Sequence, residues 1–374
     1  MVNKSTPENF ASVNSDLVFV YYDANAIDPT KLNYKYVGEL WIEGVKVYTE
    51  RVYPRPAGAF GVFNFSAQIR NRLTPLFTPL AGIEGHKEQG TGQWQLSVHV
   101  RVREEYNGTV GAVVLIDASK YFYNHYQGRT SLASIISPLR DSPLTTRDRT
   151  VNLNFTDNFY VPYFSLINTP FTVTVGANVK TITPAASPSL YSLDISPAGI
   201  NADFPGAILP SDTSYTVTFG GQTFKVNILC PGLYKNYTVH FLNQFGGLES
   251  FLFNKPSKTT YDYEKKEYRQ LPYRIHSIYG VVTLLDGVQM NEQRTVFASQ
   301  ISEKLKLQTD FVSDTDYKFL AQLVASPLVM IGEGGILYPV IISDTNYEVK
   351  QYLTDKLTTL SINVEFPTQQ TQYR

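Results

Sequence analysis

The chain has 374 residues, which exceeds the length of about 250–300 residues at which one hydrophobic core stops growing, so two or three domains are expected. A hydrophobic content of 43% and a formal net charge of −1 exclude an intrinsically disordered chain and a basic footprint for nucleic acid or anionic lipid. Cys230 is the only cysteine, which excludes an intrachain disulfide framework and a multi-thiolate metal site.

Residues 1–140 are predicted to form an N-terminal β-sandwich domain. The strand candidates are short apolar or alternating runs at 16–22, 36–42, 45–52, 94–103 and 110–116. Glu43-Gly44 lies between the runs 36–42 and 45–52, and Asn107-Gly108 lies between 94–103 and 110–116. Each pair is predicted to be the turn of a hairpin. In 94–103 apolar and polar residues alternate, as in a strand with one solvated face. Ser66 is predicted to cap a helix of one or two turns.

A second β-sandwich domain is predicted over 151–256, after a proline- and arginine-rich boundary at 137–150. Its strand candidates are 159–167, 171–175, 215–219, 224–229 and the two arms of a hairpin at 237–253. The segment 179–212 is rich in Pro, Ser and Ala, which favours a long loop with at most a short strand.

The hairpin at 237–253 carries the clearest pairing pattern in the chain. Val239 and Phe241 alternate with polar neighbours, and aromatic residues resume on one face after the glycines. Gly246 and Gly247 supply backbone angles that side chains forbid, so they are predicted to be a structural turn.

Residues 257–374 are predicted to form a C-terminal β-rich domain with one amphipathic helix, either separate or merged with the second domain. The segment 261–270 is charged and rich in tyrosine, as expected for a linker or an exposed strand. Ser313 and Asp316 form a capping box, and the helix after it has an apolar stripe. That stripe consists of Tyr317, Leu320, Ala321 and Val324.

The last alternating run, 357–366, is a candidate assembly strand. Polar residues separate its apolar ones, and the spacing of the apolar residues is close to the two-residue period of a strand. The apolar residues are Leu357, Leu360, Ile362, Val364 and Phe366. The polar tail after it is expected to reach a neighbouring molecule. Symmetric closure would remove the hazard of exposed strand edges, so we expect a homo-oligomer.

No catalytic or metal-binding pattern is found in the sequence. The five histidines (His86, His99, His125, His240 and His276) have no metal-ligand spacing, and Cys230 has no basic neighbour. Glu104-Glu105 is interpreted as strand-end charge, and the aspartates at 310, 314 and 316 as helix capping. Two carboxylates that face each other across a cleft, as in a glycosidase, stay an alternative. We expect no catalytic residues, no metal and no cofactor.

Tyr121–Tyr126 is an aromatic run that is interpreted as packing in a core or an interface, with a sugar-stacking platform as the alternative. The polar N-terminus and the lack of an apolar window of about 18 residues predict neither a secretory signal nor a transmembrane helix.

The segment Asn243–Gly247, followed by Phe251 and Phe253, resembles β-rich structural proteins of tailed phages that infect Bacteroidetes, the crAss-like group among them. The C-terminal order is similar as well: a helix at 314–324, the segments 326–330 and 338–342, and an alternating last strand. This ending resembles the closing part of tail-adaptor proteins. The match covers mainly residues 237–374 and carries no catalytic residues.

The resemblance implies a non-enzymatic virion protein that forms a symmetric oligomer in the neck, collar or tail of a tailed bacteriophage. It would assemble in the bacterial host cytoplasm, with itself and other virion proteins as partners. It would neither bind nucleic acid directly nor insert into a membrane. Two alternatives belong to other classes: a spike or fibre protein that binds a host-surface glycan, and a surface glycoside hydrolase.

Overall fold

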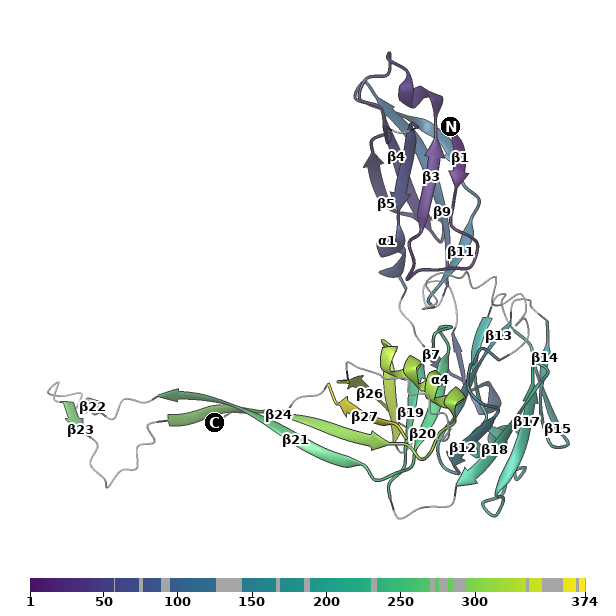
Figure 1. The fold of residues 1–374 in the computed structure, drawn as a ribbon, viewed down its shortest axis with the longest axis vertical. Coiled ribbons are helices and arrows are strands. Elements are labelled where there is room, and N and C mark those ends of the chain that lie inside the picture. Colours follow the sequence, from purple (N-terminus) through teal and green to yellow (C-terminus); the bar gives the residue numbers. More distant parts are fainter. Residues whose placement is uncertain are drawn as a thin grey trace.

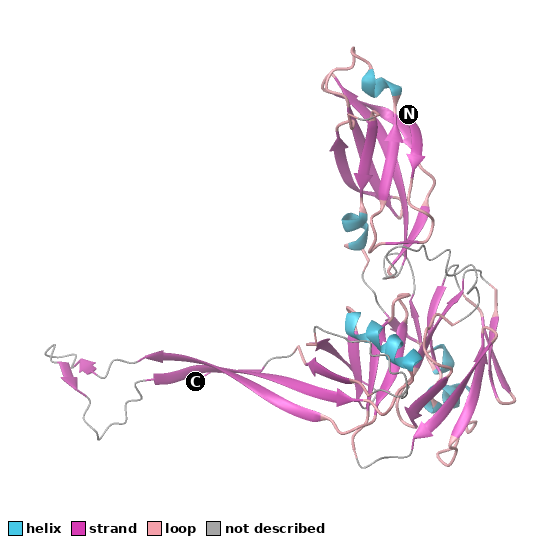
Figure 2. Ribbon diagram, in the orientation of Figure 1, coloured by secondary structure: helices cyan, strands magenta, loops and turns pink. Residues whose placement is uncertain are grey.

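The computed structural model is mainly β, as the sequence predicts, and Figure 1 shows an upright N-terminal domain, a body and a long projecting arm. The described residues are 1–56, 58–73, 77–88, 95–125, 143–165, 169–184, 189–229, 234–269, 273–275, 282–284, 294–333, 336–344, 359–367 and 370–373. Figure 2 shows how few helices accompany the strands.

The N-terminal domain packs two sheets against each other. One sheet has the order β1 (Val2–Ser5), β3 (Val18–Tyr22), β6 (Phe60–Asn64). The other has the order β2 (Ala11–Ser12), β11 (Lys120–Tyr123), β9 (Gln95–Tyr106), β4 (Lys35–Ile42), β5 (Val45–Val52), and β10 (Thr109–Ile116) also pairs with β9. The strands of these sheets pair antiparallel except for the parallel pair of β2 and β11. The short helices are η1 (Ala24–Ile27) and α1 (Ser66–Arg70).

Strand β9 confirms the predicted alternation. Its even-numbered residues from Leu96 to Val102 are at most 2% exposed and face the core. Both predicted turns adopt the left-handed backbone that two-residue hairpins require, with φ of 51° and 76° at Glu43 and Gly44 and 52° and 77° at Asn107 and Gly108. Trp94 lies outside the described residues.

Helix α1 begins one residue earlier than predicted. Ser66 is its first helical residue, and Phe65 is the N-cap without a side-chain hydrogen bond. Asn64 Oδ1 instead accepts from the Ser66 backbone N–H at 3.1 Å. The prediction of Ser66 as N-cap was therefore wrong, because the residue two positions before it satisfies that donor.

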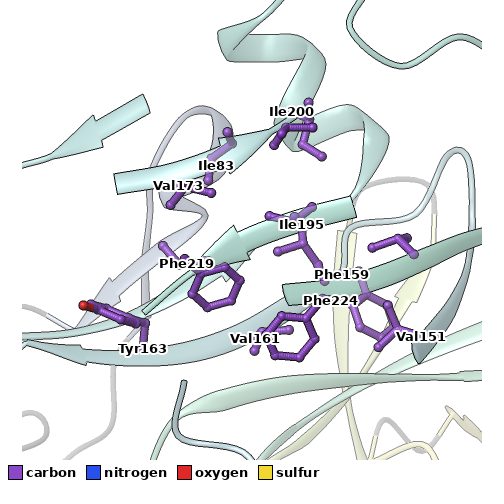
Figure 3. Close-up of a cluster of buried hydrophobic side chains, with 14 of the residues drawn as sticks. Ile83, Val151, Phe159, Val161, Tyr163, Val173, Ile195, Ile200, Phe219 and Phe224 are labelled. Carbon is purple, nitrogen blue, oxygen red and sulfur yellow. The ribbon is translucent and has the colours of Figure 1, made fainter. Parts of the chain in front are cut away.

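The second unit is a sandwich around the largest core, part of which is drawn in Figure 3. Its five-stranded sheet has the order β12 (Thr150–Asn154), β18 (Gln222–Leu229), β17 (Ser214–Phe219), β14 (Phe171–Val175), β15 (Asn178–Ile182). The pair β13 (Tyr160–Ser165) and β16 (Ser189–Asp194) faces it, with α3 (Pro197–Asp203) beside them.

A segment from the first predicted domain completes this second core. It consists of β7 (Phe77–Pro79), η2 (Gly82–Glu84) and β8 (His86–Glu88). Ile83 is fully buried in the core, and its backbone N–H donates to Asp203 Oδ2 of α3 at 2.8 Å. The chain therefore leaves the N-terminal domain and returns to it, so the boundary at 140 does not separate two continuous units.

The predicted loop at 179–212 contains β15, β16 and α3. Strand β16 reads Ser-Leu-Tyr-Ser-Leu-Asp and is buried throughout, so it lacks the one-sided alternation on which the prediction relied. Helix α3 begins with Ser196, whose Oγ accepts from the Gly199 backbone N–H at 3.2 Å, and with Pro197 in the first turn. The loop prediction was wrong for these residues.

The third sheet joins the hairpin at 237–253 to the C-terminal strands. Its order is β20 (Leu248–Phe253), β19 (Tyr237–Leu242), β25 (Val329–Glu333), β26 (Ile336–Ile342), β27 (Ser361–Glu365), β24 (Arg294–Gln308), β21 (Lys258–Arg269), and β28 (Gln370–Tyr373) also pairs with β24. The predicted boundary after 256 thus falls inside one sheet, which corresponds to the merged alternative. The hairpin is also buried on both faces, since Tyr160 of β13 donates its backbone N–H to Ser250 Oγ at 2.8 Å.

Helix α4 (Asp314–Ala325) packs against this sheet, with Ser313 as the predicted N-cap: its Oγ accepts from the Asp316 backbone N–H at 3.1 Å. The carboxylate of Asp316 accepts from the backbone N–H of Asp148 rather than closing the capping box. The buried face is Tyr317, Phe319, Leu320 and Leu323. Ala321 and Val324 of the predicted stripe lie at the margin of this buried face. The side of the helix that packs on the sheet is rotated about the helix axis by roughly one residue from the predicted stripe.

A small cluster connects the N-terminal domain to the body. It consists of Tyr123, Leu144, Phe164, Leu190 and Phe245, with Phe10 packed against it.

Candidate assembly interface

The projecting arm is built on the antiparallel ribbon of β21 and β24 (Figure 1), and the short strand β28 adds a third strand beside β24. Pairing runs from Lys258 opposite Lys306, at the body, to Arg269 opposite Arg294, with one bulge. At about 3.3 Å per residue, the 15 residues of β24 span roughly 50 Å. The short pair β22 (Tyr273–Ile275) and β23 (Val282–Leu284) lies at the far end.

One face of the arm is aromatic and continues the core face of the body. Residues directly opposite each other in an antiparallel pair share a face, and here the pairs are Thr259 with Leu305, Tyr261 with Glu303 and Tyr263 with Ile301. Leu305 is 3% exposed in the core, whereas Tyr261 and Tyr263 are 51% and 61% exposed. The face of the ribbon that is buried in the body is therefore exposed to solvent along the arm. We call Tyr261, Tyr263 and Ile301 the tyrosine face.

The opposite face of the arm is polar between Asp262 and Lys266, before the bulge. It carries Asp262, Glu264 and Lys266, and Asp262 forms an ion pair with Lys304 at 2.7 Å. The arm is thus an amphipathic ribbon, with one face suited to water and the other to a partner.

The two edges of the arm differ. Strand β24 has β21 on one side and, on the other, β27 near the body and β28 further out. Strand β21 pairs with β24 alone among the described strands. Residues Gln370–Tyr373 of the tail therefore pair with this chain's own arm, which corrects the expectation that the tail reaches a neighbouring molecule.

The side chains of the candidate assembly strand lie in the core of the body. Leu360, Ile362 and Val364 are 7%, 1% and 0% exposed, and Phe366 packs against the same cluster. Leu357 lies outside the described residues. These side chains are committed to the chain's own core, which corrects their assignment as intermolecular contacts. Sequence alternation identified a strand with one apolar face, but it did not say whose apolar surface that face meets.

The turn at Gly246 and Gly247 is organised by Asn243, which is fully buried. Its side-chain oxygen accepts from the backbone N–H groups of Phe245 and Gly247 at 3.0 and 3.1 Å. Gly246 has a φ of 84°, in the region that favours glycine. Gly247 is required for a different reason, because a Cβ there would stand 2.3 Å from the Cβ of Pro162. The two glycines therefore serve backbone shape and close packing respectively.

Glu249 lies beneath this turn and is fully buried. It accepts from Asn243 Nδ2 at 2.9 Å and from the Thr145 hydroxyl. Burial raises the pKa of Glu249 to about 7, against the opposing effect of the nearby Arg147 guanidinium. The linker before β12 is thus tied to the hairpin by a buried polar network that sequence reasoning missed.

The described histidines are packed in structural positions. His125 and His240 are at most 1% exposed, and burial lowers the pKa of His125 to about 4 and that of His240 to about 3, so both are neutral. His99 stacks on Trp41. Within the described ranges no cluster of three His, Cys, Asp or Glu residues is arranged to hold a metal ion. Cys230 and His276 lie outside those ranges.

The carboxylates considered as an enzyme pair have structural partners. Glu104 accepts from Asn25 and lies near Lys31, and Glu105 accepts from Arg51 at 2.7 Å. Asp310 pairs with Lys255 at 2.9 Å.

The aromatic run at 121–126 is largely internal. Phe122 and Tyr123 are fully buried in two different clusters, while Tyr121 is 36% exposed. Packing into a core, rather than a sugar-stacking platform, therefore accounts for the two buried rings, and Tyr126 lies outside the described residues.

Comparison with protein-family models gives no match, and comparison with curated proteins finds no significant relative. Over the part of the chain that the structure describes, no helix has the length and apolar character needed to cross a bilayer.

We expect Gly247→Val to lower the free energy of unfolding by about 1–3 kcal/mol, because the new side chain would overlap Pro162. Urea unfolding of the full chain measures this. Gly111→Ala is the control, since its Cβ would make only an ordinary contact at 3.5 Å to Glu104 O. A Gly247→Val variant as stable as the wild type would mean that the turn does not need a glycine at this position.

The raised pKa of Glu249 predicts a pH dependence of stability. Between its ordinary pKa of 4.5 and about 7, the folded state binds the proton more tightly than the unfolded state. This group therefore makes stability fall as pH rises through that window and leaves it flat above. Glu249→Gln should reduce the slope of unfolding free energy between pH 4.5 and 7. Glu264→Gln, on the exposed arm, is the control, and an equal slope in wild type and Glu249→Gln would refute the assignment.

The body should fold without the arm. Replacing residues 263–301 by Asn-Gly joins Asp262 to its directly opposite partner Ser302 through a two-residue turn. None of the residues of the body's hydrophobic clusters lies in the removed segment. We expect the melting temperature to change by about 2 °C or less, measured by circular dichroism. A large loss would show that the arm supports the body rather than projecting from it.

Proposed function

We propose that this protein is a non-enzymatic structural component of a tailed bacteriophage virion, which assembles as a symmetric oligomer in the neck, collar or tail. The arm carries this proposal: it is an amphipathic ribbon whose tyrosine face is the uncovered continuation of a core face. Contiguous exposed aromatic and aliphatic side chains on a projecting element are typical of a surface that is buried in an assembly.

The strand edges support the same proposal. Among the described strands, β21 has a neighbour on one side only, and an edge of this kind would invite promiscuous pairing if it stayed free, so natural proteins cover or blunt such edges. Four charged residues in succession, from Glu264 to Glu267, discourage non-specific pairing, and a defined partner would complete the protection. The resemblance of residues 237–374 to structural proteins of tailed phages favours a virion as the place of assembly.

The test compares the full chain with the arm-shortened variant by mass photometry over a range of concentrations. We expect the full chain to form one discrete oligomer and the shortened variant, with its body intact, to stay monomeric. Mass spectrometry of purified particles of the phage that encodes the chain should find it at a fixed copy number. A full chain that is monomeric at all concentrations and missing from particles would contradict the proposal, as would turnover in a glycan screen.

A further inference from the structure

We infer that the arms of two copies of this chain pack face to face and antiparallel, about a two-fold axis that crosses the Tyr263–Ile301 pair. The inference rests on the proposed function and names the partner of the arm: a second copy of the same chain, which covers the tyrosine face.

The described elements of the chain leave the tyrosine face of the arm exposed. The ribbon points away from both the body and the N-terminal domain (Figure 1), so neither can cover Tyr261 and Tyr263. The face is apolar at its centre, where Tyr263 stands opposite Ile301. Two such faces can pack at the usual spacing of about 10 Å between sheets.

The charges on this face select the antiparallel arrangement. On this face, successive cross-strand pairs form rows that are two residues apart along each strand. Lys265 lies in the row next to Tyr263 toward the tip of the arm, and Glu303 lies in the row next to Ile301 toward the body. A two-fold axis through the Tyr263–Ile301 row places Lys265 of each copy over Tyr261 and beside Glu303 of the other copy. The same contact therefore forms twice in the pair. Each contact combines an ion pair with a cation–π interaction. Neither Lys265 nor Glu303 has an ion-pair partner among the described residues of its own chain.

A parallel arrangement of the same two faces would lose these contacts. It would set Lys265 over Ser299, and it would leave Lys265 two rows from Glu303 of the partner, roughly 13 Å along the strand. Like the antiparallel form it would bury the apolar rings, so the ion pairs decide between the two.

Direct pairing of two β21 edges would leave the tyrosine face uncovered. A two-fold axis perpendicular to the sheet gives registers centred on Tyr263, Glu264 or Lys265. The first register sets Asp262 against Glu264. The second sets Glu264 against itself and Asp262 against Lys266 twice, and the third sets Lys265 against itself and Glu264 against Lys266 twice. Like charges directly opposite each other therefore disfavour the register centred on Tyr263. In every register, edge pairing leaves Tyr261 and Tyr263 exposed on the sheet face, so we assign the contact to the face rather than the edge.

A charge-swap experiment on the full chain tests the register. Lys265→Glu alone and Glu303→Lys alone each create two like-charge contacts per pair, and we expect each to weaken self-association on the order of tenfold or more. A mixture of the two single variants should associate with wild-type affinity, because each copy then offers the charge that the other lacks. The control Glu264→Lys makes the same charge change on the polar face and should have no effect.

A cross-linking experiment tests the face. In a Cys230→Ser background, Tyr263→Cys should be joined to its counterpart in a second copy by a short bismaleimide, since the two-fold axis crosses that row. Gln300→Cys on the polar face is the control and should not be joined. Melting curves of every variant verify that it is folded.

The outcomes separate this inference from the proposed function. Cross-linking at 263 together with rescue in the mixture supports the pairing of arms. A protein that oligomerises or enters particles without cross-linking at 263 and without rescue overturns the inference alone, as does cross-linking of 263 to a different virion protein. A monomer that is missing from particles overturns both.

Discussion

The backbone pairing of β24 connects the part of the chain that is folded by its own core to the part that is not. Near the body, β24 pairs with β27 and buries Leu305 and Leu307. Further out the same strand pairs with β21 and β28, and there it contributes no residue to the hydrophobic clusters of the described part of the chain. Because a strand keeps its faces along its length, the core face of the body becomes the tyrosine face of the arm. The arm therefore has an apolar face that is not buried within a single molecule.

The distribution of polar groups follows the same division. Inside the body, polar side chains are paired in networks such as Asn243–Glu249–Thr145, which join the linker to the hairpin. On the arm, the polar face is solvated and internally paired, while Lys265 and Glu303 on the tyrosine face have no ion-pair partner within the described residues. Unpaired charges of opposite sign that flank an apolar centre on both sides make a self-complementary surface, and such a surface is what a two-fold contact needs.

Local patterns predicted local structure well. The alternation of β9, the two-residue turns and the Ser313 cap all follow from interactions within a few residues. Elements buried on both faces are not identified by alternation, because alternation disappears when both faces meet apolar surface. For this reason the sequence predicts a loop where β16 lies and a polar face on the hairpin at 237–253, and both predictions are wrong.

The candidate site could be predicted only in part, for a topological reason. The segment 261–270 was expected to be a linker or an exposed strand, and the structure makes it an exposed strand. Its partner β24 lies across an excursion of more than twenty residues, and no local signal gives that pairing or the shared face of Tyr263 and Ile301. Conversely, the alternation of 357–366 was assigned to assembly although Ile362 and Val364 fill the core, because an apolar pattern does not distinguish an internal partner from an external one.

The most direct measurement of the account's central claim is the accessibility of individual tyrosines to a side-chain-modifying reagent, compared between dilute and concentrated protein. Covering of the tyrosine face by a second copy predicts that Tyr261 and Tyr263 are modified rapidly when dilute and are protected when concentrated. Tyr53 in the N-terminal domain, which is 65% exposed, should react equally in both. Equal modification of Tyr261 and Tyr263 at both concentrations, with oligomers present in the concentrated sample, would contradict the claim.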